Sequence, residues 1–319
     1  MNPVFHNLSH SRSSSAVSAS ALEYNPEIAC FLEDIYQACN RRERLERDPL
    51  AIVRRYSEPE DIEVAGLVCS TLAFGSVELI LRACEKALEP LGEHPAVTLA
   101  GMHPGEILQA WGSFQYRFCF PKDMIALMTA IQRALIDYGS LEGLFGKGDD
   151  KAGDRDGGGV SAAPSILSAA SAFVKKLSEY AAKAVPGGLR QNLLPDPARG
   201  SACKRLFLFL RWMVRHDEID CGCWKSVDPA RLIVPMDIHM VKTCRERLGF
   251  LPAASGARVA PGGSRKKGGL TTSGPTLADA LRVTAVFRLY APDDPVKYDF
   301  ALTRPGIDPR PGDERFGCL

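Results

Sequence analysis

The residue best placed to carry chemistry in this sequence is Asp237, which lies in the apolar stretch IVPMDIHMVKT at residues 233–243. It precedes a helical pattern, and an aspartate at such an N-cap accepts backbone N–H groups and contributes about 1 kcal/mol. A carboxylate in apolar surroundings could also act in catalysis. His239 follows in the first turn, either as a packed side chain or as a substrate contact. Capping and catalysis both remain open at this point.

A second candidate group is a row of cations on the apolar segment GSACKRLFLFLRWMVR, residues 200–215. Only Arg211 interrupts its apolar run, so this helix is expected to be buried in the middle of a domain. At 100° per residue, Lys204, Arg211 and Arg215 fall within about 40° of one another. A buried unpaired cation is costly, so the row should face either a solvent-filled cleft or acidic partners, which HDEID at 216–220 could supply. A structural ion-pair network is the alternative for the two arginines.

The beginning of the same segment is a candidate phosphate site. We expect Gly200 and Ser201 to open the helix, where free backbone N–H groups and the helix dipole can hold an anion. Arg199, Lys204 and Arg205 make this part of the chain locally basic. Many helices begin with Gly-Ser and bind nothing, so the Gly-Ser pair alone is a weak indication of a phosphate site.

These segments belong to a chain of 319 residues, of which 45% are hydrophobic and 24% charged, the profile of a globular protein. The net charge is +1, so binding to nucleic acid would need a local basic patch. No apolar run approaches the roughly 18 residues of a membrane span, and no secretory segment opens the chain. Cys221 and Cys223 have no second pair at metal-binding spacing. We therefore expect a cytoplasmic protein with free thiols, no metal and no cofactor.

The pattern is helical nearly throughout, and no segment alternates as strands do. Helices are expected at 27–40, 59–74, 77–91, 104–111, 122–138, 165–184, 201–215, 237–248, 276–290 and 294–303. The fold class predicted is all-α, a multi-helix bundle. Its organisation is predicted as an N-terminal tail at 1–24, one helical domain over 25–310, and a C-terminal tail at 311–319. The Gly- and charge-rich stretches 146–164 and 252–275 are predicted to be disordered insertions.

Three blocks of the sequence carry a resemblance: SACKRLFLFLRWMVR, LIVPMDIHMVKTCRERLGF and PDDPVKYDFAL. They resemble an uncharacterised bacterial family, domain of unknown function 2400, over most of residues 27–310 outside the insertions. The second block also looks like the Asp-Thr-His segment of the helix-hairpin-helix DNA glycosylases. Asp237 takes the place of the catalytic aspartate and His239 that of the histidine, while Ile238 replaces the threonine. This resemblance implies a two-lobed helical bundle in which the aspartate both caps its helix and does chemistry.

The bifunctional glycosylases add a lysine, and Lys204 is its counterpart here. The usual Leu-Pro-Gly-x-Gly hairpin is replaced by LLPDPARGSACK, and the longer interval to Asp237 is more like that of the archaeal 8-oxoguanine glycosylases. The four-cysteine iron–sulfur loop is absent. The resemblance implies that Lys204 attacks the sugar of an extruded nucleotide and that Asp237 assists it. It implies contacts to duplex DNA from Gly200, Ser201, Arg205, Arg211, Arg215 and His239.

Three functions are compatible with the sequence. The first is a DNA base-excision glycosylase with AP lyase activity. The second is a non-catalytic nucleic-acid-binding protein, which the altered hairpin favours, and the third is an enzyme on a small nucleoside-like substrate, which the near-neutral charge favours. The expectation that separates them is spatial. Lys204 and Asp237 should meet in an open cleft, whereas pairing of Lys204 with Asp217 or Glu218 would exclude the lyase. Trp212 or Trp224 could stack on the extruded base, and burial in the core is the alternative for both.

Overall fold

The computed structural model describes residues 23–150, 166–252 and 274–316, and every regular element in these ranges is helical. The all-α prediction is confirmed. Most of the expected N-terminal tail and of the two expected insertions lies outside the described residues. No helix within the described ranges is both long and apolar enough to cross a bilayer.

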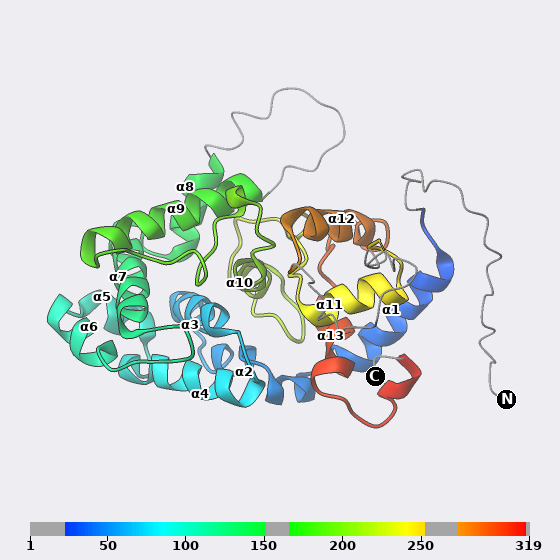
Figure 1. Ribbon diagram of the computed structural model, residues 1–319, viewed down its shortest axis with the longest axis horizontal. Coiled ribbons are helices and arrows are strands. Elements are labelled where there is room, and N and C mark those ends of the chain that lie inside the picture. The colour runs from blue at the N-terminus through cyan, green and yellow to red at the C-terminus, as the bar shows by residue number, and fades with distance from the viewer. Residues whose placement is uncertain (1–22, 151–165, 253–273, 317–319) are drawn as a thin grey trace, which may run out of the picture.

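One half of the molecule consists of the helices from α3 to α9, which lie together on the left of Figure 1. They are α3 (Pro59–Leu72), α4 (Val77–Leu88), α5 (Pro95–Gly101), α6 (Pro104–Trp111), α7 (Pro121–Tyr138), α8 (Leu141–Asp150) and α9 (Leu167–Ala184). Proline at the first position opens four of them, because its fixed φ suits a helix start and its missing N–H costs nothing there. Helix α3 is buried almost all round, as its apolar composition predicts.

The other half brings together the first and last α-helices of the described chain, on the right of Figure 1. It contains α1 (Pro26–Cys39), α11 (Ile238–Lys242) with a π-helical turn over Thr243–Arg247, α12 (Leu277–Phe287), α13 (Asp299–Ile307) and a final 3-10 turn, Asp313–Phe316. A buried ion pair of 2.7 Å joins Arg44 to Asp313, and Phe316 is buried. Residues 311–316 of the expected tail are therefore packed on the domain. A 3-10 turn (Arg42–Arg47) and α2 (Leu50–Val53) connect the halves.

Helix α10 (Lys204–Val214) lies between the two halves, at the centre of Figure 1. Its apolar side chains are buried except Leu208, which is half-buried, and Phe209 packs edge-on against Trp224. The helix begins three residues later than expected. Gly200 has φ 80° and Cys203 has φ 46°, and two left-handed residues so close together cannot continue a right-handed helix.

Two further helix boundaries differ from the predictions. The helix expected at 294–303 begins only at Asp299, and the one expected at 237–248 widens into a π-helical turn after Lys242. Tyr298, Phe300 and Leu302 are buried in the core.

Helices α2, α5 and α8 were not predicted; for α8 the reason is that its second half is rich in glycine and charge. Its first turn is held from outside the segment. The Glu63 carboxylate accepts the N–H groups of Leu141 (2.7 Å) and Glu142 (2.8 Å) as well as Nε1 of Trp224 (2.5 Å). Burial raises the pKa of Glu63 to about 7 despite these bonds. Ser140 adds a local cap by accepting the N–H of Gly143 at 2.9 Å, whereas the contribution of Glu63 has no signal within the segment itself.

Candidate active site

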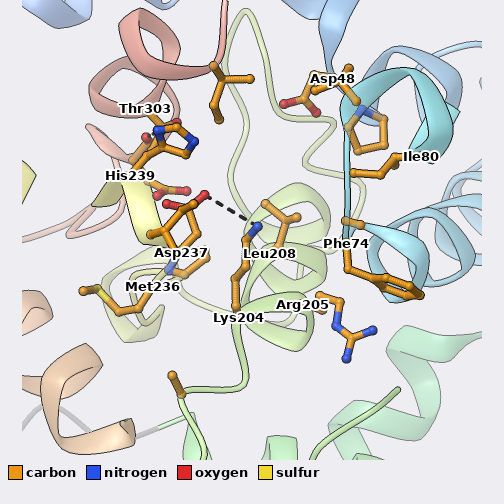
Figure 2. A pocket seen from close by; sticks show the side chains of 18 of the residues that line it. Asp48, Phe74, Ile80, Lys204, Arg205, Leu208, Met236, Asp237, His239 and Thr303 are labelled. Carbon is orange, nitrogen blue, oxygen red and sulfur yellow. Dashed lines mark hydrogen bonds and ion pairs between the residues drawn. The ribbon is translucent and has the colours of Figure 1, made fainter. Parts of the chain in front are cut away.

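A cleft of about 670 Å³ opens where the two halves meet. Its walls come from the first turns of α10, the loop before α4, the beginning of α11 and the cleft-facing side of α13. Figure 2 shows Lys204 between two sides: Asp237, His239 and Thr303 lie on one, and Asp48, Phe74 and Ile80 lie on the other. The segments that carry the predicted site residues therefore converge on one cavity.

Asp237 is the N-cap of α11. Its extended backbone places Oδ1 where it accepts the N–H of Met240 at 2.7 Å, and its own carbonyl accepts the N–H of Val241 at 2.8 Å. The preceding Pro235 and Met236 line the cleft, and Met236 is buried. Capping therefore uses one carboxylate oxygen and leaves the other free to face the cavity.

Lys204 meets that second oxygen. Its Nζ lies 3.5 Å from Oδ2 of Asp237, and the two side chains are 36% and 16% exposed. The lysine is the first residue of α10, which directs it from the buried helix into the cleft (Figure 2). Asp217 and Glu218 instead contact Arg215 and Arg41. The surface pairing that would have excluded the lyase is not what the structure shows.

Arg211 and Arg215 do not reach outward as DNA contacts. Both are buried; Arg211 pairs with Asp220 and Asp299, whereas Arg215 pairs with Asp217, Asp220 and Asp294. Their donors are occupied by carboxylates, so they have little to offer a phosphate. The ion-pair alternative describes their contacts, and it corrects the expectation that the whole cationic row faces a ligand.

This buried cluster holds two arginines against four aspartates, so its carboxylates are not equivalent. Burial raises the pKa of Asp299 to about 6; Arg211 opposes the increase and the charge of Asp237 adds to it. Burial also disfavours the charge on Asp217, but Arg215 and two backbone N–H groups outweigh it and hold that pKa at about 2. Asp299 lines the cleft, so a carboxyl group that holds a proton near pH 6 borders the Lys204–Asp237 pair.

Arg205 is the basic residue of α10 that stays close to the cleft without an acidic partner. Its guanidinium donates to the carbonyls of Thr71 (2.7 Å) and Asn192 and lies 5.1 Å from the centre of the Phe74 ring. Burial lowers its pKa to about 10, so it remains a cation at neutral pH. Figure 2 shows it beside Phe74 at the edge of the cavity.

The loop before α10 differs from the expected helix start. The N–H of Gly200 donates to the Pro197 carbonyl (2.9 Å), and its own carbonyl accepts the N–H of Leu277 (3.0 Å). Ser201 forms an isolated bridge with Thr276 and lines the cleft, while Gly200 borders a separate cavity of about 530 Å³. The helix N-terminus that faces the cleft is therefore the first turn after Cys203, which supplies no side-chain cap.

The remaining predicted residues divide between the cleft and the core. His239 lines the cleft and is half-buried, with Nδ1 only 2.6 Å from the position of a Cβ on Gly306. Trp212 and Trp224 are buried in the core and not available to stack on an extruded base, which was the alternative prediction for both. The Cys221 and Cys223 thiols are largely buried, which raises both pKa values to about 12.

Several cleft residues were not predicted, chiefly Asp48, Phe74, Asp299, Thr303 and Arg304. Asp299 is the only member of the PDDPVKYDFAL block that lines the cavity. An acidic residue at a helix start was the available signal. Phe74 gave none, because an aromatic residue at the end of an apolar helix normally packs inward.

Comparison with known proteins identifies one family. A model described as "Protein of unknown function (DUF2400)" matches residues 48–308. No curated protein and no solved structure matches the chain.

Proposed function

The chain belongs to the DUF2400 family of proteins of unknown function, and we propose that it is a DNA base-excision glycosylase with AP lyase activity. The substrate is a damaged base that leaves the duplex and enters the cleft between the two helical halves. A base in the stack cannot be attacked at its glycosidic bond, which is why such enzymes need a pocket.

One observation carries this proposal: Nζ of Lys204 and Oδ2 of Asp237 lie 3.5 Å apart in an open cleft. An amine beside a carboxylate is the minimum arrangement for attack on an anomeric carbon. The amine supplies the nucleophile, and the carboxylate accepts a proton from it or stabilises positive charge on the sugar. The position of Asp237 as a helix cap fixes the carboxylate, since its other oxygen is bonded to the backbone.

The proposed reaction proceeds as follows. Asp237 takes a proton from Lys204, and the free amine attacks C1′ of the extruded nucleotide. The electrons of the glycosidic bond leave with the base, which takes the proton held by Asp237, and the sugar ring oxygen takes a proton from the attached nitrogen. The sugar ring opens and the C1′–nitrogen bond becomes an imine, the Schiff base from which strand cleavage proceeds. Arg211 does not assist the lysine, because Asp220 and Asp299 occupy it.

Contacts to the DNA backbone come from fewer residues than the sequence suggested. The first turn of α10 carries N–H groups with no side-chain cap, and Arg205 adds a cation beside it. A helix N-terminus and an arginine next to each other favour a phosphate. The net charge of +1 restricts this attraction to the cleft and its rim.

The test is borohydride trapping with the full-length protein. Duplexes carry an abasic site, 8-oxoguanine, uracil or an alkylated base, and free nucleosides are assayed in parallel. Borohydride reduces an imine to a stable amine, so a Schiff base becomes a covalent protein–DNA adduct. Lys204→Ala should abolish the adduct, whereas Lys242→Ala, which removes an exposed lysine from α11, should leave it unchanged.

Each other outcome identifies a different function. An adduct that survives Lys204→Ala would refute the assignment of the nucleophile. DNA binding with neither trapping nor cleavage would establish the non-catalytic scaffold, and turnover of free nucleosides alone would establish a small-molecule enzyme.

A further inference from the structure

A short aromatic turn lies at the rim of the cleft and is not explained by the reaction at Lys204. The backbones of Tyr116 and Cys119 pair at 2.9 and 2.8 Å, so Arg117 and Phe118 occupy the tip of a tight turn. Both tip residues are exposed. Arg117 has φ 50°, a conformation that a residue other than glycine adopts at a steric cost.

This turn is connected to the cleft through Phe74. The rings of Phe74 and Phe118 are stacked, with centroids 4.2 Å apart and an angle of 13° between their planes. Arg205 lies over the same Phe74 ring at 5.1 Å, so Phe74 contacts both a guanidinium and the ring of Phe118. Phe74 lines the cleft, and Phe118 is 38% exposed at the outer end of the stack. We call Phe74, Phe118, Phe120 and Arg117 the aromatic rim.

The aromatic rim is held rigidly. Tyr116 Oη donates to the carbonyl of Phe74, and Arg190 donates to the carbonyl of Phe118 while it pairs with the buried Asp123 at 2.6 Å. Phe120, 39% exposed, lies 5.3 Å from the same guanidinium. Two exposed rings are thus fixed by hydrogen bonds to their own backbone segment, so little flexibility is lost when a partner binds.

The cations near the aromatic rim indicate which kind of ligand it would bind. Arg117 makes no hydrogen bond and no ion pair with any described residue, and Arg205 contacts only carbonyls and a ring. Cations without acidic partners beside exposed rings suit a ligand that has both anionic and flat aromatic parts. An unpaired nucleotide has both, since its base stacks on a ring and its phosphate pairs with an arginine.

We propose that the aromatic rim binds an unpaired nucleobase of the DNA strand that enters the cleft, with the base on the free face of Phe118 and its phosphate at Arg117. The protein then prefers DNA in which bases next to the lesion are already unpaired. This inference rests on the proposed function for the identity of the strand, but the binding itself requires no reaction at Lys204.

The test measures binding without chemistry. Fluorescence anisotropy compares three DNAs of equal length: a paired duplex, the same duplex with a central bubble, and a single strand. All three contain a tetrahydrofuran abasic analogue, which cannot form a Schiff base. We expect tighter binding of the bubble and the single strand than of the paired duplex. Phe118→Ala should weaken binding of these two by about tenfold, the usual effect of losing one base–aromatic stack.

Matched variants separate stacking from general apolar contact. Phe118→Tyr should bind like the wild type and Phe118→Leu like Phe118→Ala. Leu289→Ala removes an exposed apolar side chain from the other half of the molecule and should have no effect. Arg117→Asn tolerates the left-handed backbone and should reduce the salt dependence of log Kd by about one ion, whereas Arg117→Lys should preserve it.

Equal affinity of Phe118→Ala and wild type for all three DNAs would overturn the inference, as would an equal loss on the paired duplex. The two proposals fail separately. If the protein discriminates among the three DNAs but forms no borohydride adduct, the lyase proposal is wrong and the aromatic rim proposal stands. If it forms a Lys204-dependent adduct but does not discriminate among the DNAs, the aromatic rim proposal is wrong and the lyase proposal stands.

Discussion

Oδ2 of Asp237 lies 3.5 Å from Nζ of Lys204, while Oδ1 of the same carboxylate accepts the N–H of Met240 at 2.7 Å. One side chain therefore has a structural contact and a candidate chemical contact on different atoms. The two roles that the sequence left open do not exclude each other, and they can be separated by experiment.

Asp237→Asn should separate capping from chemistry. Asparagine caps helices about as well as aspartate, so unfolding in denaturant should match that of the wild type, while the trapping rate should fall about 10²–10⁴-fold for loss of a proton acceptor. Asp237→Ala should lose both, with an additional destabilisation of about 1 kcal/mol. If the asparagine variant trapped at the wild-type rate, Asp237 would be a cap alone.

The buried cluster around α10 should dominate stability. Asp220 is fully buried between Arg211 and Arg215, so Asp220→Ala should leave both guanidiniums short of a carboxylate and cost about 3–5 kcal/mol. The exposed pair of Arg55 and Glu85 is the control, and Glu85→Ala should cost less than about 1 kcal/mol. Urea unfolding of the two variants measures both effects; similar values would show that the cluster is not a stability determinant.

Asp299 should make stability depend on pH in a specific direction. Its pKa is raised to about 6 in the folded protein by burial, whereas an unfolded aspartate titrates near 4. Between about pH 4 and pH 6 the folded state binds more protons than the unfolded state, so the contribution of this group to stability decreases as pH rises through that window. The loss amounts to roughly 2–3 kcal/mol and is complete above the folded pKa.

Asp299→Asn isolates this effect from that of other carboxyl groups. The difference in unfolding free energy between wild type and variant should change from pH 4 to pH 6 and become constant above pH 7. A difference that stays flat from pH 4 to pH 6 would mean that Asp299 is ionised throughout.

Gly75 should be needed for the aromatic rim. It has φ 113°, and a Cβ there would lie 2.8 Å from both Arg117 Nη1 and Tyr116 Oη. Gly75→Ala should cost about 1–3 kcal/mol and weaken binding of bubble DNA. Gly92, with φ 65° and no atom within 4 Å of the Cβ position, is the control for backbone strain without the close contact. Thermal unfolding of both alanine variants should show the larger loss at Gly75.

The sequence predicted the helices whose signals are local. Helices α3 and α7 both begin with proline and acidic residues and follow a clear apolar pattern, and both lie within a few residues of their expected bounds. Helix α8 was missed because its second half is rich in glycine and charge, and because Glu63, which helps to cap its first turn, lies far away in the chain. The beginning of α10 was misplaced because the left-handed Cys203 is set by packing, which a pattern of residue types does not contain.

The candidate site divides in the same way. Lys204 and Asp237 lie at the beginnings of two helices, and helix beginnings can be predicted from the sequence. Both residues could therefore be recognised as site candidates. The sequence left ligand contact and ion pairing open for Arg211 and Arg215, and it offered HDEID as a source of acidic partners. That stretch supplies Asp217 and Asp220, but the other two carboxylates come from the distant PDDPVKYDFAL block, which no local pattern connects to α10. The stacked rings of Phe74 and Phe118 come from two different loops. Loops have no apolar periodicity, so the sequence pattern could not predict this contact.

The burial of every tryptophan has a practical consequence for spectroscopy. The chain has three, Trp111, Trp212 and Trp224, and each is at most 2% exposed and absent from the cleft lining. Intrinsic fluorescence should therefore follow unfolding of the core and remain nearly silent when DNA enters the cleft. The same emission can then be used to measure folding stability with DNA bound. Phe118→Trp would add one solvent-facing indole at the rim, and its quenching by a stacked base could be followed against the constant emission of the three buried tryptophans.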